Sequence, residues 1–249
     1  MNDNPFAIPE VHDSTLLPPR RWGSTLLKVF LLTVIGCVLV ALYLPLFHRG
    51  RAGQCWSNLK HINLALGNYR DDYGSFPPAY TVDAKGRPLH SWRTLLLPYL
   101  DQSELYQQID LSKPWNDPAN AAVLETSLAV FRCPSARTPS NHTLYLCVSG
   151  PDFCFYESTP KAISDITDGT SNTLIVVEVP QDRSVPWMAP QDAGEGLILG
   201  IVQSSRGAHA GFIHAALADG SIRFLSVDIE RPTLRAMLTI SGDETVGEF

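Results

Sequence analysis

The stretch that decides the fold is V-F-L-L-T-V-I-G-C-V-L-V-A-L-Y-L-P-L-F, residues 29–47, together with its polar continuation to Tyr73. The run carries no charge and, at about 1.5 Å per helical residue, approaches the roughly 30 Å hydrocarbon thickness of a bilayer. Lys28 stands at its edge, where a long side chain can reach the membrane interface. We therefore predict a transmembrane helix over residues 25–47.

The continuation, residues 54–73, has the pattern of an amphipathic helix. Apolar residues recur at alternating steps of four and three, which places them on one helical face. They are Cys55, Leu59, Ile62, Leu66 and Tyr69. Gly74 and the pair Pro77-Pro78 end the helix, because proline lacks the amide hydrogen that a helix interior needs. The sequence thus predicts an anchor that leads into the spine of an external domain.

The flanks of the apolar run indicate how the chain is placed. Residues 1–24 are polar and lack periodicity, which predicts a disordered cytoplasmic tail. The run is longer than the core of a cleavable signal peptide and no small-x-small site follows it, so the anchor should stay in the mature protein. Cysteine usage and the larger C-terminal part favour a single-pass topology with residues 48–249 outside the cytoplasm.

Composition bounds the class of the domain. The formal net charge of −6 argues against a nucleic-acid partner, which needs clustered Lys and Arg. With 19 prolines, 17 glycines and only 18% charged residues, residues 48–249 suit a loop-rich and strand-rich domain. Its size, about 200 residues, is enough for one core.

Local patterns predict a series of short elements. A hairpin or loop with Gly86 at its tip should join Val82 to Pro88. Four short helices follow from caps and prolines: 91–100 capped by Ser91, 101–109 with an Asp101/Glu104 capping box, 120–129, and 232–238. Strands are expected at 143–148 and 173–179. The strongest signal is a hairpin of 212–218 and 221–225 joined by Asp219-Gly220, the residue pair typical of a type I′ turn.

Five cysteines are available. Cys37 lies within the apolar run, and the other four are Cys55, Cys133, Cys147 and Cys154. In an oxidising compartment these four allow three pairings, and we favour Cys147–Cys154 or Cys133–Cys154 if one disulfide forms. The spacing lacks CxxC, which argues against zinc.

Further polar residues have simple structural explanations. Glu178, inside an apolar strand, is expected to pair with Arg183 or Arg223, and His214 to be half-exposed. Oxygen ligands for calcium are offered by three residues, although an Asp168-Gly169 turn explains the pattern equally well. They are Asp165, Asp168 and Thr170.

Several segments, taken in order, resemble the DUF1559 family of pilin-like envelope proteins. They are C-W-S-N-L-K-H-I-N-L-A-L-G-N-Y-R-D-D-Y-G-S-F-P-P from Cys55, S-W-R-T-L-L-L-P-Y-L-D-Q from Ser91, F-R-C-P-S from Phe131, I-T-D-G-T-S-N-T-L-I-V-V-E-V from Ile166, V-P-W from Val185, and His209 followed after nine residues by Asp219-Gly220. The resemblance covers nearly everything from Cys55 to the end. It implies an α+β, pilin-like fold in which the long N-terminal helix packs on an antiparallel sheet with short peripheral helices.

The family resembles type IV pilins and type II secretion pseudopilins, whose N-termini a peptidase cleaves after a glycine. Gly23 stands at that place here, but Lys28 stands where a pilin has the glutamate that neutralises its neighbour's N-terminus. A lysine would bring like charges together, so we favour a permanently anchored variant.

We therefore expect a non-catalytic, pseudopilin-like structural or secretion-associated protein, with no cofactor and no metal. The bilayer is its expected partner, and other pilin-like subunits or secretion machinery are further ones. The signature residues His209, Asp219, Gly220, Asp168 and Gly169 are read as structural. One alternative is a tethered module that binds a glycan or peptide through aromatic residues, namely Trp92, Tyr99, Trp187 and Tyr80. A second alternative is an envelope hydrolase that uses His209 with Asp219.

Overall fold

The computed structural model describes residues 22–204, 209, 211–244 and 246, and for 22–25, 43–50, 52 and 202–204 it describes the helical backbone alone. The chain divides into two units, residues 1–47 and 48–249, and each is described by itself. The predicted tail, residues 1–24, lies almost entirely outside the described residues.

Helix α1 (Trp22–Tyr73) supplies the first unit and also the first element of the second. In the first unit the side chains from Leu26 to Leu42 are exposed, and nearly all of them are apolar. Within the described residues, no helix offers a segment both long and apolar enough to cross a bilayer. The transmembrane prediction for 25–47 extends into 43–47, whose side chains lie outside the described residues.

In the second unit α1 is the amphipathic spine that the sequence predicts. Cys55, Leu59, Ile62 and Leu66 are fully buried, and burying each large side chain of this kind contributes about 1.5–3 kcal/mol. The helix ends where expected: Gly74 adopts a φ of +74°, and its amide donates to the Arg70 carbonyl at 2.7 Å. This is the glycine cap that lets a chain leave a helix.

The main sheet has four antiparallel strands in the order β4-β5-β7-β8. They are β4 (Tyr145–Cys147), β5 (Leu174–Glu178), β7 (Phe212–Leu217) and β8 (Ile222–Ser226). Two small antiparallel pairs accompany it: β1 (Tyr80–Val82) with β2 (Pro88–Ser91), and β3 (His142–Thr143) with β6 (Val185–Pro186). The α+β class with antiparallel sheets is therefore confirmed.

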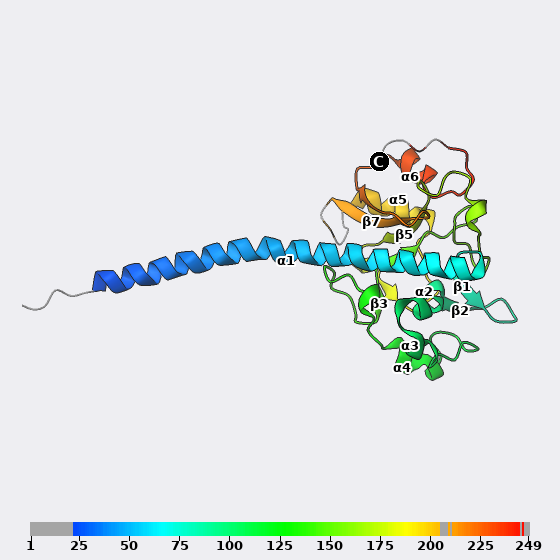
Figure 1. Cartoon of the computed structure of the whole chain (residues 1–249), viewed down its shortest axis with the longest axis horizontal. Helices are drawn as coiled ribbons and strands as arrows, with labels where there is room; N and C mark the ends of the chain where they lie inside the picture. Colours follow the sequence, from blue (N-terminus) through cyan, green and yellow to red (C-terminus); the bar gives the residue numbers. More distant parts are fainter. Residues whose placement is uncertain (1–21, 205–208, 210, 245, 247–249) are drawn as a thin grey trace, which may run out of the picture. The chain divides into compact units, whose positions relative to one another are not determined.

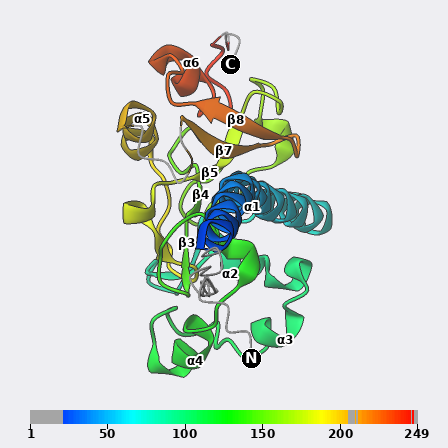
Figure 2. The same ribbon diagram turned by 90° about the vertical axis from the view of Figure 1, so that its left-hand side faces the viewer.

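Short helices surround this core. They are α2 (Trp92–Leu95), η1 (Leu97–Leu100), α3 (Ser103–Tyr106), η2 (Pro118–Asn120), α4 (Ala121–Leu124), η3 (Ala129–Phe131), η4 (Ile163–Asp165), η5 (Gln181–Arg183), α5 (Glu195–Ser204) and α6 (Arg231–Ala236). In both views β5 and β7 lie between α1 and α6, while α2, α3 and α4 lie on the other side of α1 (Figures 1 and 2).

Hydrogen bonds fix α1 to its surroundings. The Asn63 side chain donates to the Leu217 carbonyl of β7 at 3.1 Å, and the Tyr145 hydroxyl of β4 donates to the Cys55 carbonyl at 3.2 Å. Asn58 donates to the carbonyls of Ala129 and Arg132. The spine is therefore joined by polar as well as apolar contacts to elements that lie far from it in the sequence.

Two of the predicted local geometries are wrong. The Asp101/Glu104 capping box does not form, because Asp101 takes a left-handed φ of +57° that closes η1, and α3 begins at Ser103. The β7–β8 turn is not type I′, because only Gly220 has a positive φ, +94°, and not Asp219. The Gly220 amide donates to the Leu217 carbonyl, so three residues form the loop, as in a type I turn with a following glycine bulge.

Candidate functional site

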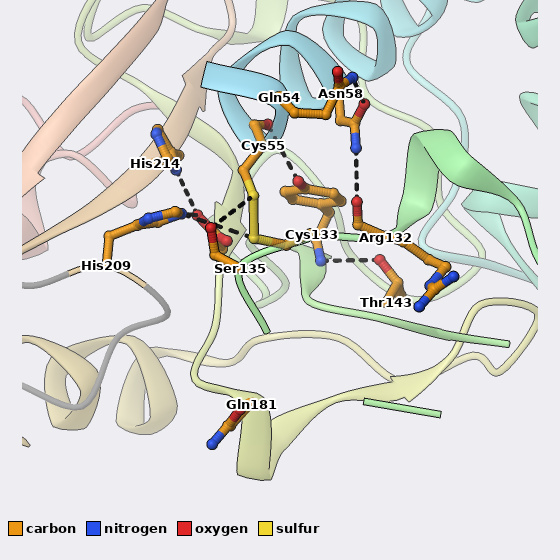
Figure 3. Close-up of a disulfide and its surroundings, with 12 residues drawn as sticks. Gln54, Cys55, Asn58, Arg132, Cys133, Ser135, Thr143, Gln181, His209 and His214 are labelled. Atoms are coloured by element: carbon orange, nitrogen blue, oxygen red, sulfur yellow. Dashed lines mark hydrogen bonds and ion pairs between the residues drawn. A yellow bond between two sulfur atoms is a disulfide. The ribbon is translucent and has the colours of Figure 1, made fainter. Parts of the chain in front are cut away.

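A disulfide joins the spine to the loop after η3. It links Cys55 with Cys133, 78 residues apart in sequence, with Cα atoms 4.9 Å apart (Figure 3). Both favoured pairings, Cys147–Cys154 and Cys133–Cys154, are therefore wrong. The reason is spatial: Cys55 is on the buried face of α1 that meets Cys133, whereas Cys147 and Cys154 are free thiols within the core.

Beside the disulfide lies a cluster of one buried carboxylate and two buried imidazoles. His214 Nδ1 lies 2.5 Å and His209 Nε2 lies 3.3 Å from Glu178 Oε2. His209 Nε2 is also 3.8 Å from Cys133 Sγ. Figure 3 shows both histidines turned toward one point next to the sulfur atoms.

Two predictions about this cluster are corrected by the structure. Glu178 does not pair with Arg183 or Arg223, because it points between β5 and β7 to the histidines. His214 is 0% exposed rather than half-exposed. Every residue of β7 after Phe212 is buried, whichever face of the sheet it points to, so the apolar alternation that the sequence shows does not mark a solvent face.

The electrostatics of the cluster favour an ionised carboxylate. Burial alone would raise the pKa of Glu178, but the hydrogen bonds and charges of His209 and His214 outweigh it, so this pKa lies below its ordinary value. Glu178 Oε1 and His214 Nε2 are buried and lack a hydrogen-bond partner among the described residues. A buried polar atom without a partner carries a desolvation penalty of about 1–3 kcal/mol, so the cluster is only partly satisfied.

The signature motif splits into two structural parts. His209 belongs to the cluster before β7, whereas Asp219 belongs to the turn after it. There the Asp219 carboxylate accepts from the Ser221 amide at 2.8 Å and from its hydroxyl at 2.7 Å. The six residues of β7 lie between them, roughly 20 Å of strand at about 3.3 Å per residue. The structure therefore does not bring His209 and Asp219 together.

The aromatic candidates do not share a surface. Trp92 and Trp187 are buried, at 0% and 1% exposure, and their indole N–H groups donate to Asp192 and to the Thr126 carbonyl. Tyr99 is half-buried and donates to Asp72. Burial raises the pKa of Tyr99 and of Tyr80. The two indoles thus serve the core, not a stacking platform.

Asp168 and Gly169 organise the C-terminal segment. The Asp168 carboxylate accepts from the Thr239 hydroxyl and from the amides of Gly242 and Asp243. Gly169 adopts a φ of +97°. Asp165 accepts from the Ala162 amide. Donor groups of the chain thus already engage the carboxylate oxygens that were considered for calcium.

A second buried charge pair was not anticipated from the sequence. Arg93 is 0% exposed, and its guanidinium donates to Asp192 Oδ1 at 2.9 Å and to four backbone carbonyls. The carbonyls are those of Tyr145, Trp187, Ala189 and Gln191. Asp192 Oδ1 also accepts from Trp92 Nε1 and the Cys147 amide. The only sequence signal was the S-W-R segment that carries part of the family resemblance.

One group of side chains has the donor atoms of a metal site. The ligand atoms of Cys55, Cys133, Glu178 and His209 all lie within 4.8 Å of one another, and all four residues are buried. No CxxC spacing indicates this group, because its members come from α1, the loop after η3, β5 and position 209, three residues before β7. In the oxidised chain two of the four donors are occupied by the disulfide.

Comparison with known proteins gives a family for part of the chain. Residues 49–152 match the family described as "Protein of unknown function (DUF1559)", which confirms the family expected from the sequence over that segment. The His209–Asp219 motif lies outside the matched residues. Neither the curated proteins nor the solved structures gave a match.

Proposed function

We propose that this chain, which carries a DUF1559 segment over residues 49–152, is a non-catalytic, single-pass envelope protein. Residues 25–47 act as the bilayer anchor and residues 48–249 as an exported domain of pilin-like form. Its work is structural or secretion-associated, in the manner of a pseudopilin. The observation that carries the proposal is α1, which pairs an exposed apolar half with a half that forms the spine of a disulfide-closed domain.

The first half of α1 has the surface of an anchor. Its exposed large apolar residues occupy successive helical positions, so they surround the helix rather than form one stripe. They are Leu26, Leu27, Val29, Phe30, Leu31, Leu32, Val34, Ile35, Val38, Leu39, Val40 and Leu42. A helix that is apolar all round belongs in a protein core or in lipid. Among the described residues of the first unit, 22–47, α1 has no second element beside it that would supply a core.

The disulfide supports export of the second unit. Such bonds persist in oxidising compartments and are rare where glutathione keeps thiols reduced. Among the side chains of α1 that the structure describes, Cys55 is the first buried one, so the bond closes the domain soon after the proposed anchor. This agrees with an N-terminus inside the cytoplasm and a folded domain outside.

The pilin-like character rests on how one helix is used. The second half of α1 contacts β4 and β7 of an antiparallel sheet, the arrangement that the family resemblance implies. Lys28, in place of the pilin glutamate, favours a fixed anchor over a processed subunit. The Asp219 carboxylate accepts a hydrogen bond from the Ser221 amide within the β7–β8 turn, which also supports a non-catalytic role.

Matched arginine substitutions in α1 test the anchor. Leu39 and Leu64 are almost equally exposed, at 61% and 63%, but belong to different units. An arginine near the middle of a spanning helix opposes insertion by about 2.5–3.5 kcal/mol. We expect Leu39→Arg to shift the protein from the alkali-washed membrane fraction to the soluble or degraded fraction, while Leu64→Arg stays in the membrane.

N-terminal sequencing and intact mass of the native protein test the fixed anchor. The proposal expects the chain to begin at Met1 or at Asn2. A mature terminus at Ser24 bearing an N-methyl group would show that a prepilin peptidase accepts the chain, and the permanent anchor would be wrong. Recovery of the wild-type protein in the soluble fraction would contradict the anchor itself.

A further inference from the structure

Four buried side chains meet at the disulfide, two of them its own cysteines, and each comes from a different part of the chain. They are Cys55, Cys133, Glu178 and His209, with ligand atoms within 4.8 Å of one another (Figure 3). The signature motif and the proposed anchor do not explain why a buried carboxylate and an imidazole lie against a sulfur–sulfur bond.

We propose that, when the Cys55–Cys133 bond is reduced, these four side chains bind one zinc-type divalent cation. The disulfide and the metal are then two alternative ways to close the same site. This inference rests on the cluster alone and does not depend on membrane anchoring or on a pilin-like role.

The distances suit a tetrahedral ion. Bonds of about 2.3 Å to sulfur and about 2.0–2.1 Å to nitrogen or oxygen place neighbouring ligand atoms of a tetrahedron roughly 3.3–3.8 Å apart. His209 Nε2 lies 3.3 Å from Glu178 Oε2 and 3.8 Å from Cys133 Sγ. These two ligand–ligand distances already fall within the range that a tetrahedral site requires. Reduction allows the distance between Cys55 Sγ and Cys133 Sγ to reach this range as well, because two sulfur atoms that are no longer bonded move apart.

The donor set also suits zinc. Thiolate, imidazole and carboxylate are its three protein ligands, and two soft sulfurs select against magnesium and calcium. The exposed fractions of the four residues run from 0% for Cys55 to 8% for His209, so His209 marks the side from which an ion would enter.

Outer contacts would hold the ligands in place. His214 Nδ1 is 2.5 Å from Glu178 Oε2 and fixes the carboxylate from behind. The Ser135 hydroxyl lies 3.9 Å from Cys55 Sγ, where it can donate to a thiolate. Partners of this kind orient metal ligands and tune their basicity. A bound cation would also offset the burial of Glu178, whose Oε1 has no partner among the described residues.

The chemistry balances with a dithiol as reductant. Thiol–disulfide exchange breaks the Cys55–Cys133 bond, gives two protein thiols and leaves the dithiol as its own cyclic disulfide. Two electrons and two protons move to the protein. Zinc binding then converts both thiols to thiolates and releases two protons. Exchange with a disulfide oxidant reverses the sequence: the oxidant accepts two electrons from the two thiolates, takes up two protons and becomes a dithiol, and the zinc ion is released. The two protein sulfurs then rejoin at roughly 2.05 Å, too close to act as separate corners of the tetrahedron.

Cobalt(II) titration of the full chain in detergent provides the test. One sample is kept oxidised; the other is reduced with dithiothreitol and freed of it under anaerobic conditions. We expect the reduced chain to bind one Co²⁺ with the strong visible absorption of a tetrahedral thiolate site, and one Zn²⁺ to displace it. The oxidised sample, identical in sequence, should bind none.

Substitutions identify the ligands. His209→Gln and Glu178→Gln should each weaken Zn²⁺ binding by about tenfold or more, whereas His61→Gln, on the exposed face of α1, should leave it unchanged. Circular dichroism of each reduced variant reports folding. If the reduced chain unfolds without metal, Zn²⁺ should restore the fold, because binding and folding are then coupled.

Four results would overturn the proposal. One is a reduced, folded chain that takes up no stoichiometric Co²⁺. Another is an octahedral spectrum, which would place the ion elsewhere. The third is an affinity for Zn²⁺ that survives in His209→Gln and Glu178→Gln. The fourth is a reduced and unfolded chain that Zn²⁺ fails to refold.

Discussion

Asp192 and Glu178 are two buried carboxylates among the described residues, and they pair with different kinds of partner. Asp192 faces the guanidinium of Arg93, which makes five hydrogen bonds and keeps its charge at any pH at which proteins fold. Glu178 faces two imidazoles, whose charge is variable, beside a bond that can be reduced. The first arrangement is a fixed joint. In the second, reduction of the disulfide would free two sulfur atoms beside the carboxylate.

The fixed joint should give the largest loss of stability. Arg93→Met leaves Asp192 buried without its cation and removes the four hydrogen bonds of the guanidinium to backbone carbonyls, so we expect the free energy of unfolding to fall by about 3–5 kcal/mol. Urea unfolding followed by tryptophan fluorescence measures it. Arg87→Met is the control, because Arg87 is 75% exposed in its pair with Asp83. Equal urea midpoints for Arg93→Met and Arg87→Met would show that the buried Arg93–Asp192 pair does not stabilise the fold.

Removal of the disulfide beside Glu178 should give the second largest loss of stability. It closes a loop with a sequence separation of 78 residues, and losing such a constraint costs roughly 2–4 kcal/mol. We expect Cys133→Ala to lower the unfolding midpoint and to make it insensitive to dithiothreitol. Cys154→Ala, at a buried free thiol, should keep the wild-type response to the reductant. A wild-type midpoint that dithiothreitol leaves unchanged would show that this bond does not stabilise the domain.

These two regions also show how far the sequence could lead. Local sequence signals predicted the structure correctly where one residue or one periodicity determines the local element. The apolar face from Cys55 to Tyr69, the Gly74 stop, the Ser91 cap and the β7–β8 hairpin were all predictable. The buried charges were not, because each is satisfied by residues far away: Arg93 by Asp192, and Glu178 by His214, 36 positions on.

The pairing of strands explains most of what was missed. β5 and β7 are neighbours although α5, a helix that the sequence analysis did not predict, lies between them in sequence. That pairing brings Glu178 to the histidines. The disulfide was mispredicted for a similar reason: four cysteines allow three pairings, and spacing favoured the near ones. The structure instead uses the pair that joins α1 to the loop after η3.

Acid should distinguish the two carboxylate sites. The pKa of Glu178 is lowered in the folded chain, so the stability it contributes is present above its ordinary value of 4.5 and is lost as the pH falls through the folded value. We expect Glu178→Gln to be about 1–3 kcal/mol less stable than wild type at pH 7. Below about pH 4.5 the difference should shrink, because the wild type then becomes protonated while glutamine does not titrate.

Urea unfolding at pH 7 and at pH 4 measures this change. Leu234→Ala, a truncation of a fully buried residue, removes no titrating group and is the reference. Its deficit should be the same at both pH values. A Glu178→Gln deficit that widens in acid would mean that the histidines do not hold the carboxylate ionised.

The smallest change in stability is expected in the signature motif. Its two parts, His209 and Asp219-Gly220, should respond differently to substitution. Gly220 has a φ of +94°, and an added Cβ would meet no described atom within 4 Å, so Gly220→Ala should cost about 1 kcal/mol through backbone strain alone. Gly67, in the helical spine, also has open space but no positive φ. Gly67→Ala should therefore stabilise by about 0.5–1 kcal/mol. Thermal unfolding compares the two opposite signs.

The same pair tests the division of roles within the motif. If Asp219-Gly220 serves only the turn, Gly220→Ala leaves Zn²⁺ binding by the reduced chain at the wild-type value, whereas His209→Gln weakens it. A Gly220→Ala chain that folds but binds the metal more weakly would join the two halves into one unit. Since roughly 20 Å of strand lie between them, such coupling would have to pass along β7 through His214. The rigid pairing of β7 with β8 would then be part of the site and not merely its support.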